Sequence, residues 1–337
     1  MAGGPSKGVW STALLLLSYN NYAPGDISML LRLMLLLLCS LGLSFPVLAD
    51  SAKVLTTIKP LQQIAAAVMD GVDTPAVLLP PGNSPHNYAL RPSDRRALLN
   101  AERIYWVGPE LELFLEDVLG RQGNAQALLH LPGIRVREQL QSINFQEDES
   151  EHNLGHDHGH DHDHGALDSH IWLSPDNALH IARFMADDLA SLYPQHADRL
   201  SSNAEAFAKR LSALDMRLKN RLEPLQDRAY FVFHDGYGYF EDHYGLRPRG
   251  IFSLSHEVQP GARHINLLRQ QLQKAGASCV FTEPQFTPRL VDSLTQGLPV
   301  EKGELDPLGG GIQISARGYE QTLNLLAEQM ANCLEKL

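Results

Sequence analysis

A histidine- and aspartate-rich segment is the part of this sequence whose residue types point most directly to chemistry. Six histidines fall within thirteen residues and alternate with three aspartates: His152, His156, His158, His160, His162, His164, Asp157, Asp161 and Asp163. No apolar residue lies between Leu154 and Ala166, so the segment cannot bury enough surface to offset the entropy lost on ordering. We therefore predict a loop over 147–168 whose imidazoles and carboxylates collect metal ions. A low-complexity acidic loop is the alternative.

Three other histidines stand where ordered structure is expected, and they are candidates for a site of fixed geometry. His234 directly follows the apolar segment 229–233, and His86 follows a predicted strand and a Pro-Pro-Gly turn. Both would lie at the carboxyl ends of strands, where ligands gather in parallel sheets. His170 opens the segment His-Ile-Trp-Leu-Ser-Pro, where the tract rejoins ordered structure. Three neutral imidazoles suit Zn²⁺, with a fourth position for a carboxylate or water.

The remaining histidines have no comparable placement, and we expect surface or packing roles for them: His130, His180, His196, His243, His256 and His264. His243 and His256 are the hardest of these to exclude. A structural, hydrogen-bonded role is also the alternative for each of the three candidate ligands taken singly. Their joint position beside a polyhistidine tract favours the ligand interpretation.

Positioning such a site requires ordered elements, and the first part of the chain alternates predicted strands with helices. We expect strands at 53–58, 76–79 and 104–107 and helices at 61–69, from Pro92 onward and at 110–119. This alternation predicts the α/β class, with parallel sheets flanked by helices.

A long helical segment then separates this lobe from a second α/β lobe. Residues 196–223 contain no Pro or Gly and repeat apolar residues at three- and four-residue spacing, which predicts a connecting helix of about 40 Å. Other expected elements are a helix at 176–192, strands at 229–233, 250–253, 278–281 and Val300, and helices at 262–274, 288–296 and 317–334. The predicted domains are a lobe at 50–194, a connecting helix at 195–223 and a lobe at 224–337, with a ligand cleft between the lobes.

Residues 1–49 read as a targeting segment. Met29 begins a short region with Arg32 and an apolar run that ends at Val-Leu-Ala49, the pattern of a cleavable signal peptide. Residues 1–28 look like an upstream extension, so Met29 is the expected start. No later apolar run approaches the ~20 residues that cross a bilayer, and we expect an exported, soluble protein.

Charge and cysteine content indicate which binding partners and which cellular compartment to expect. The 337-residue chain has a formal net charge of −11 and no large basic cluster, so nucleic acid and anionic membranes are poor partners. After cleavage near Ala49 only Cys279 and Cys333 remain. An even pair in an oxidising compartment predicts a disulfide, with two buried free thiols as the alternative.

Seven motifs spread between Lys53 and Cys333 form a specific set. They are Leu-Leu-Pro-Pro-Gly-x-Ser-x-His at 78–86, Leu-Arg-Pro-Ser-Asp at 90–94, Trp-Val-Gly-Pro-Glu at 106–110, His-x-Trp-Leu-Ser-Pro at 170–175, Tyr-Phe-Val-Phe-His-Asp at 230–235, Gln-Pro-Gly-Ala at 259–262 and Leu-Asp-Pro-Leu-Gly at 305–309. The set resembles the periplasmic zinc-binding proteins of high-affinity zinc-uptake ABC transporters, the ZnuA type. This resemblance implies two lobes on a long rigid helix, zinc at their interface, and delivery by a monomer to an inner-membrane permease with its ATPase.

The resemblance also implies a ligand set, because the family's three histidine ligands fall on His86, His170 and His234. Some zinc-binding relatives carry an acidic residue just before the first of these, but Pro85 stands here, which favours water in the fourth position. Manganese-binding relatives carry Glu at the third position, so His234 argues for zinc. Asp306 remains a candidate fourth ligand or supporting carboxylate. A His/Asp-rich loop before the second ligand is also common in this family.

Other function classes stay open beside this one. A manganese- or iron-binding protein of the same transporter class would share the fold. An exported zinc-dependent hydrolase would also use three histidines and an open water position, but no motif supplies its general base. A metal-binding adhesin or buffer differs only in lacking a permease partner. The sequence contains no zinc-protease, nucleophile-elbow or phosphate-loop motif, so we expect a binding protein and not an enzyme.

Overall fold

The computed structural model describes residues 53–138, 167–253, 262–285 and 289–337. The predicted signal peptide, the six tract histidines and His256 therefore lie outside the described residues. Within the described part of the chain, no helix is long and apolar enough to cross a membrane.

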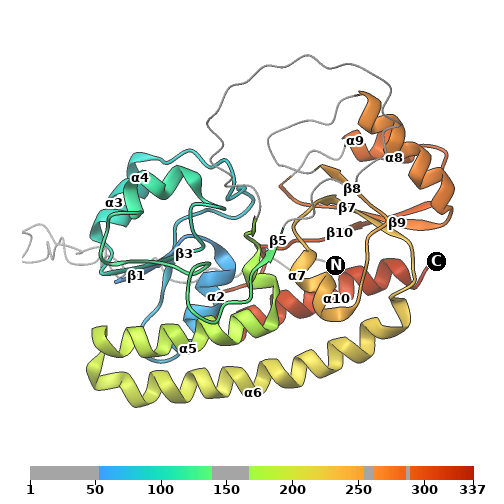
Figure 1. The fold of residues 1–337 in the computed structure, drawn as a ribbon. Helices are drawn as coiled ribbons and strands as arrows, with labels where there is room; N and C mark the ends of the chain where they lie inside the picture. The colour runs from blue at the N-terminus through green and yellow to red at the C-terminus, as the bar shows by residue number, and fades with distance from the viewer. Residues whose placement is uncertain (1–52, 139–166, 254–261, 286–288) are drawn as a thin grey trace, which may run out of the picture. The chain divides into compact units, whose positions relative to one another are not determined.

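The N-terminal lobe is built on a parallel sheet of four strands in the order β2-β1-β3-β4 (Figure 1). The strands are β1 Val54–Thr56, β2 Ala76–Val77, β3 Arg103–Trp106 and β4 Ala125–Ala127, and the helices of this part are α2 Lys59–Val68, α3 Pro92–Asn100, α4 Glu116–Leu119 and α5 Pro175–Leu192. Every residue of α2 from Pro60 to Val68 is buried, as a helix enclosed by other elements requires. The predicted α/β class is confirmed.

Three predicted elements of this lobe differ from the structure. The strand expected at 53–58 forms only Val54–Thr56, and strand β4 was not predicted. Residues 110–119, expected to be one helix, form a 3₁₀ turn at Leu113–Leu115 and the short α4. The buried carboxylate of Glu112 instead accepts hydrogen bonds from the N–H groups of Val107 and Gly108, so this side chain closes a loop where a helix was expected. Strand β2 is shorter than 76–79, although the N–H groups of Leu78 and Leu79 still bond the neighbouring strand.

The C-terminal lobe repeats the design with a parallel sheet in the order β10-β9-β7-β8. Its elements are β7 Tyr230–His234, α7 Gly238–Tyr244, β8 Gly250–Ser253, α8 Ala262–Ala275, β9 Ser278–Thr282, α9 Arg289–Thr295, β10 Val300–Glu304 and α10 Gly318–Leu334. The expected strands agree within one or two residues, and the strand suspected at Val300 is present. Helix α7 and the two-residue ribbon of β5 Arg137–Glu138 with β6 Leu167–Asp168 were not predicted.

The long helix α6, Ala197–Leu222, has 26 residues, or about 39 Å at 1.5 Å per residue. Its buried stripe is the predicted one: Leu200, Ala204, Phe207, Leu211, Leu214, Leu218 and Leu222. The stripe packs on α5, α2 and α10, and Figure 1 draws α6 running alongside α5 and then alongside α10. The division of the chain at residues 194 and 223 stays a prediction.

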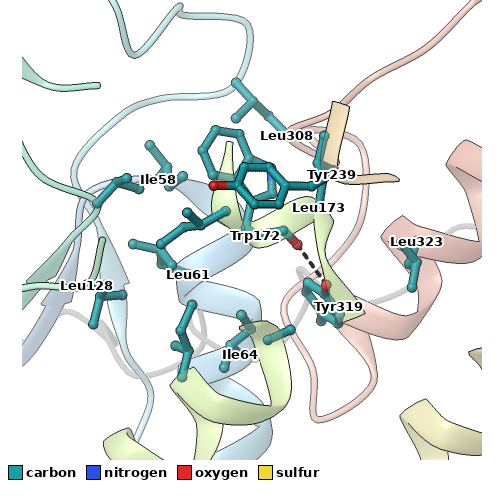
Figure 2. Packing of buried hydrophobic residues seen from close by; sticks show 14 of the residues in the cluster. Ile58, Leu61, Ile64, Leu128, Trp172, Leu173, Tyr239, Leu308, Tyr319 and Leu323 are labelled. Carbon is teal, nitrogen blue, oxygen red and sulfur yellow. Dashed lines mark hydrogen bonds between the residues drawn. The ribbon is translucent and has the colours of Figure 1, made fainter. Parts of the chain in front are cut away.

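One hydrophobic core runs through both lobes. Figure 2 draws Ile58, Leu61 and Ile64 of the N-terminal lobe in one buried cluster with Tyr319 and Leu323 of α10. The Tyr319 hydroxyl donates to the backbone oxygen of Trp172 at 2.7 Å. Helix α10 contacts helix α2 of the N-terminal lobe and strands β9 and β10 of the C-terminal lobe. The lobes therefore cannot separate without exposing apolar surface.

Cys279 of β9 and Cys333 of α10 form a disulfide, which confirms the predicted pair. The bond ties the last helix to the C-terminal sheet, and that helix in turn packs on the first lobe.

We predict that replacing both cysteines with alanine destabilises the protein by up to about 4 kcal/mol, because the bond closes a loop with a separation of 54 residues and restricts the unfolded chain. Denaturant unfolding should give a lower midpoint for the variant than for the oxidised wild type. The reduced wild type serves as the control and should unfold at the same midpoint as the variant. Labelling of the denatured, unreduced protein should find no thiol, and two labelled thiols would contradict the pairing.

Candidate metal centre

Three histidine side chains from distant parts of the chain meet at one point. His86 lies in the loop after β2, His170 precedes the 3₁₀ turn Ile171–Leu173, and His234 ends β7. The Nε2 atom of His170 is 3.4 Å from that of His86 and 3.3 Å from that of His234. Of the residues that the structure describes, these are the only group of three or more His, Cys, Asp or Glu side chains arranged to hold a metal ion.

The loop that carries His86 is stiffened by its own sequence. Gly82 adopts φ +80°, a left-handed conformation that favours glycine, and the preceding prolines restrict the approach to it. The Asn83 side chain donates to the backbone oxygen of Pro80 at 3.0 Å. His86 then receives support from Ser84, whose hydroxyl accepts from the His86 N–H at 3.3 Å.

The imidazole of His234 lies over Gly236, two residues further along the chain. A Cβ atom at position 236 would come within 2.2 Å of the His234 Nε2, far closer than such atoms approach. The Asp-Gly sequence that follows the strand therefore leaves space for this ring to turn back toward His170.

Carboxylates hold the outer nitrogens of two of these histidines. The Asp168 Oδ1 atom lies 2.8 Å from His170 Nδ1 and also accepts the His170 N–H at 3.0 Å. Glu283 Oε1 forms a short contact with His234 Nδ1. An imidazole whose Nδ1 proton is directed at a carboxylate presents the lone pair of its Nε2 atom when it is neutral. The Nε2 atoms of His170 and His234 face each other across 3.3 Å, an arrangement that a cation would stabilise.

Burial sets the charge state of the site. It lowers the pKa of both His86 and His234 well below the ordinary value, and the neighbouring His170 lowers both further. Burial also raises the pKa of Glu283 well above its ordinary value. Burial opposes ionisation of Asp168, but its bonds to His170 and the charge of Arg137 hold the pKa of that carboxyl below the usual value. At His86 and His234 the neutral imidazole, which metals require, is therefore favoured.

The spacing and the space available fit a zinc ion. At a tetrahedral zinc with bonds of roughly 2.0–2.1 Å, ligand nitrogens lie about 3.3–3.4 Å apart. The adjoining cavity measures about 10 Å³ and is lined by the three histidines together with Pro85, Trp172, Glu283 and others. Such a volume holds one water-sized ligand.

Asp306, the candidate fourth ligand, lies outside this convergent group. Its carboxylate accepts hydrogen bonds from the N–H groups of Leu308 at 3.0 Å and Gly310 at 2.7 Å. The Asp306 side chain thus shapes the turn that brings Leu308 to the cavity. A direct contact with metal stays a prediction for it.

The other described histidines whose contacts are defined have structural partners. His130 pairs with Glu110 at 2.8 Å, and His243 pairs with Asp215 at 2.7 Å. His180 lies 2.7 Å from the backbone oxygen of Pro132. These contacts agree with the surface and packing roles expected for them.

Sequence reasoning missed the two carboxylates that support the ligands. Glu283 directly follows strand β9, so the rule that selected His234 at the end of β7 would also have selected it. Asp168 lies two residues before His170, inside the segment assigned to the loop. Both side chains are buried, and their partners became evident only in three dimensions.

Comparison with known proteins agrees with this geometry. The family model "Zinc-uptake complex component A periplasmic", ZnuA, matches residues 54–333. The high-affinity zinc uptake system protein ZnuA of Yersinia pestis is 42% identical over 307 residues, which cover 89% of this chain and 96% of that protein. Its counterpart in Haemophilus ducreyi is 37% identical over 290 residues, covering 84% and 94%.

Solved structures show the same fold. A crystal structure of ZnuA superposes with a TM-score of 0.68 at 25% identity and covers 85% of this chain and all (100%) of that one. A zinc-bound ZnuA with residues 138–173 of its own numbering deleted gives 0.67 at 26% identity, with coverage of 84% and 98%. The family match and these relatives together show that the chain belongs to the ZnuA family of periplasmic zinc-uptake components.

Proposed function

We propose that this protein captures zinc in the periplasm and delivers it to the permease of an ABC transporter. The observation that carries this proposal is the approach of the Nε2 atoms of His170 and His234 to within 3.3 Å of each other. Each ring is held in this orientation by a buried carboxylate. His86 completes a set of three nitrogen donors, with water as the expected fourth ligand.

The donor set supports zinc over manganese or iron. Manganese and other hard ions favour carboxylate and carbonyl oxygens, whereas three imidazole nitrogens converge here. The curated relatives are named for high-affinity zinc uptake.

The family match supports a binding protein over a hydrolase. The matched family model is named for a component of a zinc-uptake complex, and the curated relatives are named for zinc uptake. We extend this to a periplasmic monomer, exported by a signal peptide cleaved near Ala49, that works with an inner-membrane permease and its ATPase.

The first test removes the ligands singly. His86→Ala, His170→Ala and His234→Ala should each weaken zinc binding at least about tenfold, because each loses one of three donors. Competition titration with a zinc chelator measures the affinity, and His130→Ala, at an exposed pair with Glu110, is the matched control. The wild type, but not the triple variant, should restore zinc-limited growth to a strain lacking its own zinc-binding component. Wild-type affinity in all three single variants would place the site elsewhere.

The second test concerns pH. Free imidazole has a pKa of about 6.5, but burial lowers the pKa of His86 and His234, so protons compete with zinc only at lower pH. We expect the zinc Kd to stay nearly constant from about pH 7.5 to 6.5 and to rise below about pH 6. Titrations corrected for the chelator's own protonation measure this, and a tenfold loss already at pH 6.5 would contradict it.

The metal-free protein should also lose stability as pH falls through about 6.5, because only the unfolded state then gains these protons.

The third test addresses the tract of six histidines, which we propose as an auxiliary collector of zinc. Ligands on a loop lose conformational freedom with each ion bound, so their affinity should be weaker than that of a preformed site. Deleting 151–165 should remove weak zinc equivalents and leave one tight site, as counted by equilibrium dialysis. Loss of the tight site with the weak ones intact would mean that the tract supplies ligands to it.

A further inference from the structure

The short ribbon of β5 and β6 connects the metal centre to the second lobe. In its register Arg137 lies opposite Asp168, the residue that holds the His170 ring. Figure 1 draws β5 beside α7, the helix that begins four residues after His234. The ribbon therefore links the segment that holds His170 to the helix that follows His234.

The Arg137 guanidinium bridges two carboxylates from different lobes. One terminal nitrogen donates to Asp168 Oδ2 at 2.9 Å, and Nε donates to Asp242 Oδ2 of α7 at 2.9 Å. The side chain is only 14% exposed and that of Asp168 is fully buried. The pair with Asp168 is therefore screened much less than a surface pair, whereas the Asp242 side chain is 34% exposed.

The Tyr239 hydroxyl of α7 makes a second connection to the same ribbon. It accepts the Arg137 N–H at 2.9 Å and donates to the Asp168 backbone oxygen at 2.9 Å. Helix α7 is thus bonded to both strands of the ribbon, through a side chain and through the backbone.

Gly238, the first residue of α7, is the position that makes room for the guanidinium. A Cβ atom there would lie 2.0 Å from the Arg137 terminal nitrogen. Alanine is the better residue inside a helix, and no positive φ calls for glycine at this position. The absence of a side chain at 238 therefore serves the approach of Arg137.

We propose that Arg137 is a positioning residue of the zinc site, which clamps the His170 side of the site to the helix that follows His234 and so slows zinc release. The inference rests on the proposed function. With Oδ2 of Asp168 fixed by Arg137, Oδ1 is directed at two nitrogens of His170, the backbone N and the ring Nδ1. A planar guanidinium can hold two carboxylates at set angles, whereas a lysine ammonium is a single point charge.

The test compares zinc affinity and release rate, by chelator competition and stopped flow, in four variants. Arg137→Gln should weaken binding about tenfold, in the range typical of groups that orient metal ligands, mostly through faster release. Asp242→Asn should weaken zinc binding less than Arg137→Gln does. Arg137→Lys should resemble Asp242→Asn, because lysine cannot bridge both acids. Gly238→Ala should also speed release, although alanine favours the helix.

Two features separate the clamp from a general effect on folding. The Arg137→Gln, Asp242→Asn double variant should be no weaker than Arg137→Gln alone, since Asp242 acts through Arg137. Arg247→Gln, which removes the exposed partner of Asp242, and Arg210→Gln, which breaks the pair with Glu320, should both release zinc like the wild type.

The proposal would be overturned if Arg137→Gln released zinc at the wild-type rate, whether or not its melting temperature fell. It would also be overturned if Arg137→Lys behaved like the wild type. Failure of the zinc assignment itself would look different, as tight binding that survives both His170→Ala and His234→Ala.

Discussion

The structure depends on two imidazole Nε2 atoms that are kept facing each other in a buried place. Left alone, the rings of His170 and His234 would turn away or share a proton across the 3.3 Å between these atoms. Asp168 and Glu283 prevent this by holding the opposite nitrogen of each ring. The free energy needed to keep such a site comes from the rest of the fold, which must be stable enough to tolerate it.

The shared core supplies that stability. Helix α10 belongs to the C-terminal lobe by its disulfide to β9, yet it packs on α2 of the N-terminal lobe and on α6. A ligand from each lobe is therefore positioned on sheets that share one apolar interior. This differs from a binding protein with a flexible hinge, where each lobe buries its own core and the ligand brings them together.

The sequence was informative where the pattern was local. Leucines at helical spacing located α6, apolar runs located the buried strands, and strand ends located His86 and His234. It was uninformative where structure depends on distant partners. Glu283 is 49 residues from His234, and Arg137 pairs with Asp168 across an intervening segment of the chain. Helix α7, only 7 residues long and opened by Gly238, has too few turns to show a period, and the two-residue strands β5 and β6 are shorter than any alternation that could be recognised.

The burial of the ligands also bears on how an ion enters. His170 and His234 are each only 4% exposed, so an ion can bind both of them only after most of its water shell has left. Magnesium dehydrates reluctantly, and the converging imidazoles offer it nitrogen in place of the oxygen ligands that it prefers. The common hard ions are thus opposed by the cost of dehydration as well as by the nitrogen donors, and selection begins before the ion meets its third histidine.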